Sequence, residues 1–165
     1  MSLFVSFLFV SFGGTMDLRT ELPRLLPGAI AWAQSQATHV AESGIALNAA
    51  GLDLARRVGV VSPERIRLKV FRALPLPDDP TLRAAAVEAG LLGPNMVGLT
   101  LGQSILVCHG HVTARLISHE CRHVQQYEAH GSIEAFLPIY LAQVITLGYA
   151  NAPFELDARA HEVSA

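Results

Sequence analysis

The sequence has few residues that would cross-link the chain or attract an anionic partner. It contains two cysteines and one lysine among 165 residues, and its formal net charge is −2. Two cysteines do not make the dense disulfide framework of small secreted proteins, so we expect a reduced, cytoplasmic chain. Because there is no basic excess, neither nucleic acid nor an anionic membrane surface is an expected partner.

The sequence also lacks an apolar run of membrane-spanning length near its start. Residues 3–12 (LFVSFLFVSF) are apolar over about ten positions, whereas a transmembrane helix needs about twenty. No basic residue precedes Arg19, which disfavours a secretory signal peptide, because such a signal begins with a basic region. We therefore treat residues 1–15 as an apolar N-terminal extension, with Met16 as an alternative start, and residues 16–165 as a single domain.

Composition and periodicity predict a mostly helical α+β domain with a small antiparallel sheet. Hydrophobic residues make up 51% of the chain, enough for one core. Helical spacing, capping residues and stops at glycine or proline mark the helices, and alternation marks the strands. The expected helices cover residues 22–40, 48–57, 79–88, 112–129, 133–147 and 153 to the C-terminus; the expected strands cover 65–70, with its basic side in water, and a hairpin of 96–100 and 104–107.

One motif carries recognisable chemistry. Residues 119–123 read H-E-x-x-H and lie within the helix expected over 112–129. Residues four apart share a helix face, so His119 and His123 can bind one metal ion. Glu120 can then act as general base on a water molecule that zinc activates. The motif therefore predicts a zinc site on this helix.

A catalytic zinc site needs a third protein ligand, and the C-terminal segment offers several. Glu155, Arg159 and Glu162 share one face of the expected last helix, and Asp157 and His161 share another. Only one of these faces can be turned toward the metal. Spacing alone leaves Glu155, Asp157 and His161 open as the third ligand.

Residues 119–127 (HECRHVQQY) and 148–158 (GYANAPFELDA) resemble the short form of the gluzincin metallopeptidases, as found in small bacterial proteins. The resemblance covers roughly residues 99–162 and implies a zincin-like fold with an apolar backing helix over 133–147. It implies that His119, His123 and Glu155 are the zinc ligands and Glu120 is the general base. By analogy with zincins, it also implies that the 96–107 hairpin pairs with an extended peptide substrate.

The chain departs from the gluzincin pattern at one position. Many gluzincins carry an acidic residue four positions after the ligand glutamate, where it supports a histidine ligand. Here that position is Arg159, so either Asp157 supplies this contact or the site is tuned differently or impaired. The other large zincin class is not indicated, because Gln126 stands where its pattern requires glycine.

Three functional hypotheses follow from these residues. The first is a zinc-dependent hydrolase, a peptidase acting on a peptide or protein substrate. The second is a zinc-binding regulatory or interaction module without turnover, and the third is a helical interaction domain without metal. Two other groups of residues could be mistaken for sites. Cys108, His109 and His111 lie close together in the sequence, and we expect them to be structural. We expect Cys121 to be a buried apolar residue.

Overall fold

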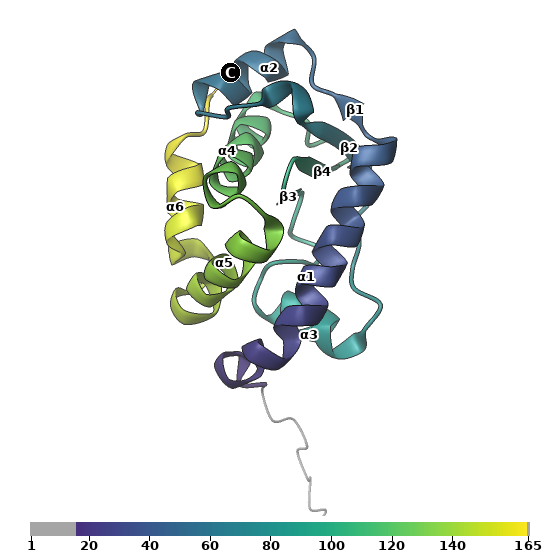
Figure 1. Ribbon diagram of the computed structural model, residues 1–165, viewed down its shortest axis with the longest axis vertical. Coiled ribbons are helices and arrows are strands. Elements are labelled where there is room, and N and C mark those ends of the chain that lie inside the picture. Colours follow the sequence, from purple (N-terminus) through teal and green to yellow (C-terminus); the bar gives the residue numbers. More distant parts are fainter. Residues whose placement is uncertain (1–15, 165) are drawn as a thin grey trace, which may run out of the picture.

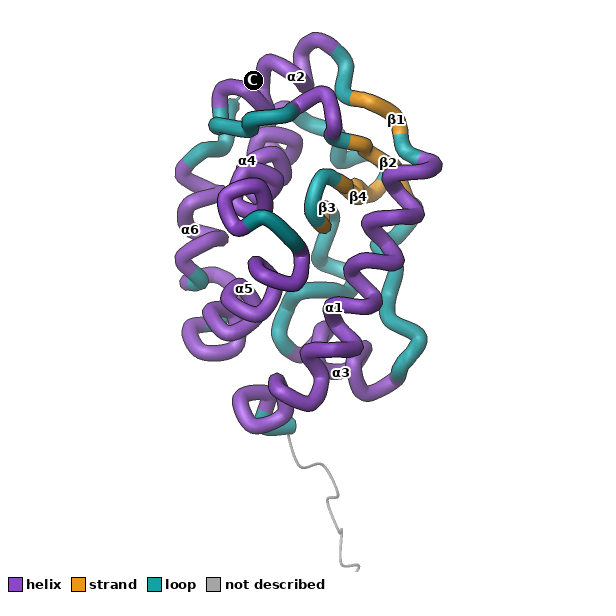
Figure 2. The backbone as a smooth tube through the Cα atoms, viewed as in Figure 1, coloured by secondary structure: helices purple, strands orange, loops and turns teal. Residues whose placement is uncertain are grey.

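The computed structural model describes residues 16–164, and the apolar extension expected over residues 1–15 lies outside them. Helices surround a small sheet (Figure 1, Figure 2). The α+β class is therefore confirmed. In chain order the elements are α1 (Leu18–Ser43), β1 (Ile45–Ala46), α2 (Ala49–Arg57), η1 (Pro63–Arg65), β2 (Arg67–Phe71), α3 (Pro80–Glu88), β3 (Gly98–Leu101), β4 (Ser104–Cys108), α4 (Ala114–His130), α5 (Ile133–Leu147), η2 (Tyr149–Asn151) and α6 (Pro153–Ala160).

The sheet is mixed, so the expectation of a purely antiparallel sheet is wrong. Its strand order is β1-β2-β4-β3, and β2 and β4 run parallel while both outer pairs are antiparallel. The segment that contains α3 provides the long connection that parallel strands require. Strands β3 and β4 then form a hairpin, which places β4 beside β2. All five residues of β4 are buried, as is usual for a strand with neighbours on both sides.

The core lies on both faces of the sheet. Ile105 and Val107 of β4 point into a cluster formed with α2 and α4, and the intervening Leu106 and Cys108 point into a cluster formed with α1 and α5. Figure 1 shows α4 and α1 on opposite sides of the strands. The sheet therefore supports α4, the helix that carries the H-E-x-x-H residues.

Helix α1 is longer than the sequence pattern predicted. Asp17 is its N-cap, and its carboxylate accepts hydrogen bonds from the Arg19 amide and the Thr20 hydroxyl. Two prolines lie inside the helix, Pro23 and Pro27, and both are exposed. They are four residues apart, so both missing N–H groups fall on one solvent-facing side of the helix.

Strand β2 differs from the expectation for residues 65–70 in its start and its surroundings. Pro63–Arg65 form a 3₁₀ turn, so the strand begins at Arg67. Its basic side does not lie freely in water. The Lys69 ammonium donates to the Ser43 hydroxyl and lies 2.8 Å from His39 Nε2, both on α1, while Val70 is exposed. Packing of α1 over this face therefore partly covers the basic side chains.

The remaining expected helices are confirmed with shifts of one or two residues at their ends, except the last one. Helix α6 ends at Ala160 instead of continuing to the C-terminus, so His161 and Glu162 lie beyond it. Asn48, Asp79, Thr113 and Ser132 each accept a hydrogen bond as N-caps of α2, α3, α4 and α5. The apolar α5 has 15 residues. Within residues 16–164, every helix is too short or too polar to cross a membrane.

The buried side chains of the central strand β4 contribute strongly to the stability of the fold. Replacing Ile105, which is fully buried between β2 and β3, with alanine should lower the free energy of unfolding by about 2–5 kcal/mol, because it leaves a cavity in the core. Urea denaturation measures the change. The control is Ile45→Ala at a side chain that is 69% exposed, which should change stability far less. Equal losses in both variants would contradict this view of the core.

Candidate metal centre

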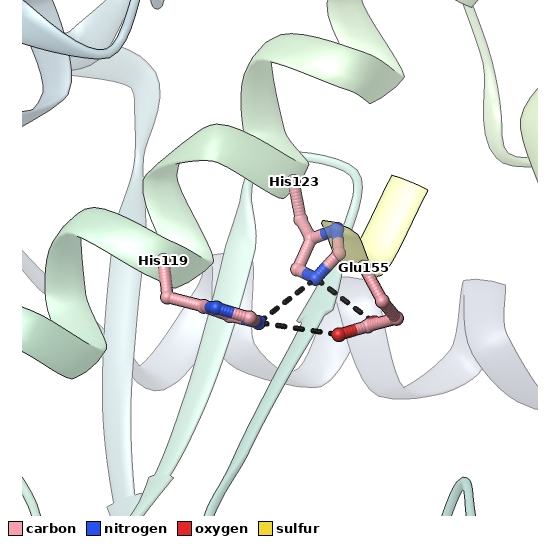
Figure 3. A group of neighbouring side chains, drawn as sticks. All are labelled: His119, His123 and Glu155. Atoms are coloured by element: carbon pink, nitrogen blue, oxygen red, sulfur yellow. Dashed lines mark hydrogen bonds and ion pairs between the residues drawn. The ribbon is translucent and has the colours of Figure 1, made fainter. Parts of the chain in front are cut away.

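Helix α4 presents its motif residues to the interior. Thr113 caps the helix by accepting a hydrogen bond from the Leu116 amide, and Gly131 ends it with a φ of 90°. His119, Glu120 and His123 are all buried. Figure 3 shows both imidazoles pointing toward the side chain of Glu155 on α6.

The two histidines and Glu155 bring their ligand atoms together. The two Nε2 atoms are 3.2 Å apart, His123 Nε2 is 3.2 Å from Glu155 Oε1, and His119 Nε2 is 3.5 Å from Glu155 Oε2. Ligand atoms of a tetrahedral zinc ion lie about 3.3 Å from one another, given bond lengths of about 2.0–2.1 Å. The spacing of these atoms therefore matches a single metal ion, and the three residues form a group that could hold one.

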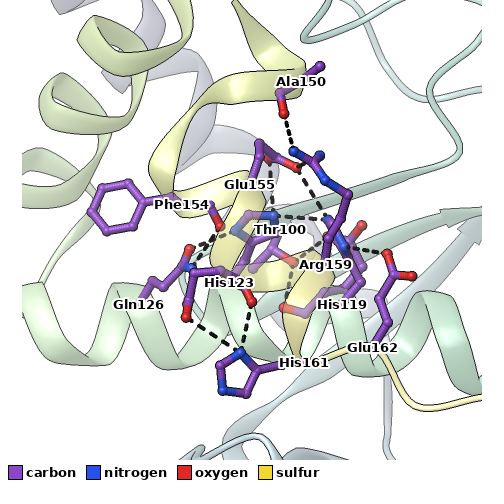
Figure 4. Close-up of polar contacts among 12 residues, drawn as sticks. Thr100, His119, His123, Gln126, Ala150, Phe154, Glu155, Arg159, His161 and Glu162 are labelled. Atoms are coloured by element: carbon purple, nitrogen blue, oxygen red, sulfur yellow. Dashed lines mark hydrogen bonds and ion pairs between the residues drawn. The ribbon is translucent and has the colours of Figure 1, made fainter. Parts of the chain in front are cut away.

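A hydrogen-bond chain determines which nitrogen of His123 carries a proton. The Gln126 amide NH₂ donates to the Phe154 carbonyl at 3.0 Å and to Asp157 Oδ2 at 2.8 Å (Figure 4). Its oxygen must then face His123 Nδ1, at 2.8 Å, and an amide oxygen can only accept. Nδ1 is therefore protonated, and the lone pair of neutral His123 lies on Nε2.

His119 is held in the same tautomer by a different residue. Its Nδ1 lies 3.1 Å from Glu162 Oε1, and the other oxygen of Glu162 accepts a hydrogen bond from Arg115. The ionised carboxylate accepts from Nδ1, which again leaves the lone pair on Nε2. The Val163 amide donates to the Ser118 hydroxyl at 2.8 Å and fixes this end of the chain against α4.

Two imidazole lone pairs and a carboxylate therefore converge in a buried space. Such an arrangement repels itself unless a proton or a cation lies among the three groups. Glu155 Oε2 is also a buried oxygen without a hydrogen-bond partner among the described residues. The donor set, two imidazoles and one carboxylate, is that of catalytic zinc sites. The residues present thus fit a zinc ion, while the structure itself leaves the identity of the metal open.

Glu155 has the environment of an ionised ligand. It is 1% exposed, and its Oε1 accepts a hydrogen bond from the Tyr140 hydroxyl at 2.7 Å. Burial acts to raise the pKa of Glu155, but its interactions with His119 and His123 outweigh burial and hold the pKa well below the usual range. For His123 burial acts to lower the pKa, and the negative charge of Glu155 raises it overall. The same negative charge favours a cation at this site.

Glu120 is fixed beside the ligands without joining them. Its Oε2 accepts a hydrogen bond from the Thr100 hydroxyl at 2.7 Å, and its Oε1 lies against Gly98 on β3. Any side chain at Gly98 would overlap that oxygen. Burial raises the pKa of Glu120, and the nearby His123 and His119 oppose that rise. Glu120, His123 and Glu155 line one small cavity.

Two other predicted ligand candidates have different roles. Asp157 faces away from the metal site and accepts from Arg122 at 2.7 Å and from Gln126. His161 Nδ1 lies 2.8 Å from the backbone oxygen of Asp157. The structure therefore brings Glu155 to the histidines, and Asp157 supports His123 only through Gln126.

Sequence reasoning missed the residues that orient the ligands. It treated Gln126 only as a departure from another motif and Glu162 only as a neighbour of Glu155 on one helix face, and it treated Tyr140 only as part of the apolar backing helix over 133–147. The seven-residue spacing of Glu155 and Glu162 was the available signal. Among the described residues, Cys108, His109 and His111 join no metal-binding group, and Cys121 is buried as expected.

Metal binding should depend on the three converging residues. We expect zinc to bind about one per chain and to raise the melting temperature, because it binds only the folded site. Both effects should be lost in His123→Ala and Glu155→Gln. His109→Ala, at an exposed histidine, is the matched control and should retain zinc. Elemental analysis and thermal unfolding with and without a chelator provide the test, and zinc retention in both ligand variants would contradict the assignment.

The orienting residues should set metal affinity without supplying ligand atoms. Gln126→Ala and Glu162→Gln should each weaken zinc binding by about 10–100-fold, because they release Nδ1 of His123 or His119. Competition with a chromophoric chelator measures the affinity. Gln125→Ala on the same helix is the control, since its side chain makes none of these contacts. Unchanged affinity in both orienting variants would show that tautomer control is unimportant here.

Comparison with known proteins does not assign the chain to a family. No family model matches the chain, and no curated protein or solved structure matches it. The resemblance to gluzincins therefore rests on the sequence motifs of residues 119–127 and 148–158.

Proposed function

We propose that this protein is a zinc-dependent hydrolase, and specifically a peptidase of the gluzincin kind. The observation that supports it most directly is the position of Glu120, an unliganded carboxyl group in the same cavity as His123 and Glu155. A purely structural metal site would have no need of such a group. Structural zinc sites are instead closed by a fourth protein ligand.

Each residue has a distinct part in the proposed reaction. A bound zinc ion would polarise the substrate carbonyl group and make a water molecule more acidic. Glu120 would take a proton from that water and later give it to the leaving amine. Burial raises the pKa of Glu120, and a raised pKa favours the step in which the carboxyl group holds the proton before giving it to the amine. Thr100 would hold the carboxyl group in place.

The position of β3 supports a substrate with an extended main chain. β3 is an outer strand of the sheet, and its residues Gly98 and Thr100 border the cavity of Glu120. An outer strand offers unpaired N–H and C=O groups that can pair with a peptide. Gly98 is required there because a side chain would displace the Glu120 carboxylate.

A zinc-binding module without turnover is the second candidate, and Arg159 favours it. Its Nη1 lies 3.6 Å from Glu155 Oε2, and Nη2 donates to the Ala150 carbonyl (Figure 4). A guanidinium beside a ligand carboxylate competes with the metal for negative charge. In this alternative the same ligands bind zinc for stability or for recognition of a partner.

Glu120→Gln separates the two candidates. In the peptidase, this variant should lose hydrolysis of a peptide library by 10²-fold or more, because the general base is gone, while still binding zinc. Glu128→Gln on the same helix is the control, and it should retain activity because Glu128 bonds to Val61 and Ser62 away from the site. Full activity in Glu120→Gln would exclude the mechanism. Zinc binding without cleavage by the wild type would favour the second candidate.

A further inference from the structure

A long apolar groove lies beside the metal site and has no part in the function proposed so far. It runs between α1, α3 and α5, which lie together in Figure 1. On α1 its wall is the stripe Leu18, Leu22, Leu25, Ala29 and Ala33. These positions span about 22 Å along the helix axis at a rise of 1.5 Å per residue. The groove is therefore much longer than any single amino-acid side chain.

The groove adjoins the cavity of the metal site. Leu91, Leu99, Leu101, Leu137 and Tyr140 line both the groove and the small cavity that contains Glu120, His123 and Glu155. One of them, Tyr140, donates its hydroxyl to the ligand Glu155. A molecule that extends from the groove past these shared side chains would have one end at the metal ligands.

The groove is large enough to be a binding site. Its volume is about 100 Å³, several times the roughly 10–15 Å³ that one water molecule needs. Apolar space of this size lowers the stability of the fold when no apolar group fills it.

The chemistry of the wall restricts what can lie in it. Its lining side chains are aliphatic apart from Trp32 and Tyr140, and Gly98 and Thr100, which border the metal cavity, are not among them. A polypeptide main chain in this groove would lose water from its N–H and C=O groups without gaining partners. A hydrocarbon chain has no such groups, and its burial is favourable along the whole length.

We propose that the substrate is an amide of a long-chain carboxylic acid, with its hydrocarbon chain in this groove and its carbonyl carbon at the metal site. This inference rests on the proposed hydrolase function, with the acyl chain on the carbonyl side of the scissile bond and the peptide that pairs with β3 on its amine side. In the reaction water adds to the carbonyl carbon, the C–N bond breaks, and the proton that Glu120 takes from water goes to the leaving nitrogen. The products are the long-chain acid and a free amine.

The length of the acyl chain is the variable that tests the proposed substrate. The acetyl, hexanoyl and decanoyl amides of 7-amino-4-methylcoumarin share one leaving group, and the zinc-loaded full chain releases the fluorescent amine from each. We expect kcat/KM to rise by up to about fourfold for each added methylene until the groove is filled. Equal kcat/KM for all three amides would leave the hydrolase function in place and overturn the acyl-chain inference.

A binding measurement separates this inference from catalysis. Acetyl and decanoyl hydroxamic acids carry the same metal-binding head, and titration calorimetry below the micelle concentration compares them. We expect the decanoyl compound to bind roughly tenfold to a thousandfold more tightly, both to the wild type and to Glu120→Gln. Such a difference without hydrolysis of any amide would support the groove and exclude the hydrolase. Equal binding of the two compounds would overturn the inference whatever the catalytic result.

Substitutions on α1 test where the hydrocarbon chain of the ligand binds. Ala29→Phe should fill the groove and bring the affinity for the decanoyl compound down to near that for the acetyl compound. Ala31→Phe, at an exposed position of the same helix, is the matched control and should keep the preference. Retention of the full decanoyl preference in Ala29→Phe would overturn the proposal.

Discussion

The electrostatic repulsion among three buried acceptors is the constraint on which the rest of the site depends. Two imidazole Nε2 atoms and the Glu155 carboxylate meet within 3.5 Å of their nearest partners. This arrangement is stable only if a positive charge lies among them. The surrounding hydrogen bonds maintain this convergence. Gln126 and Glu162 accept from the Nδ1 atoms of His123 and His119, so both Nε2 lone pairs point toward the shared space.

The fold provides this convergence through elements that are distant in the sequence. The sheet supports α4 from one side, and α5 reverses the chain so that α6 returns along α4. β3 completes the arrangement, since Thr100 and Gly98 fix the carboxyl group of Glu120 beside the ligands. The candidate metal ligands, the proposed general base Glu120 and the apolar groove thus meet at the edge of one small sheet.

Local signals in the sequence predicted the helices and the candidate ligands. The helix over 112–129 and the residues His119, Glu120 and His123 follow from periodicity and a four-residue spacing, and Glu155 follows from resemblance to a family. Strand order was not predictable, because nothing in residues 104–107 indicates that β4 lies between β2 and β3. The orienting role of Gln126 depends on contacts with Phe154 and Asp157, which only the folded chain brings near.

The shortness of α6 has a consequence for how this part of the molecule holds together. The helix has eight residues, too few to persist in water on its own. A cation shared by α4 and α6 would hold the two helices together across α5, and because it binds only the folded site it would stabilise this part of the chain. The C-terminal third would then fold and open as one cooperative unit. Loss of the ion would therefore weaken the wall of the site as well as its chemistry.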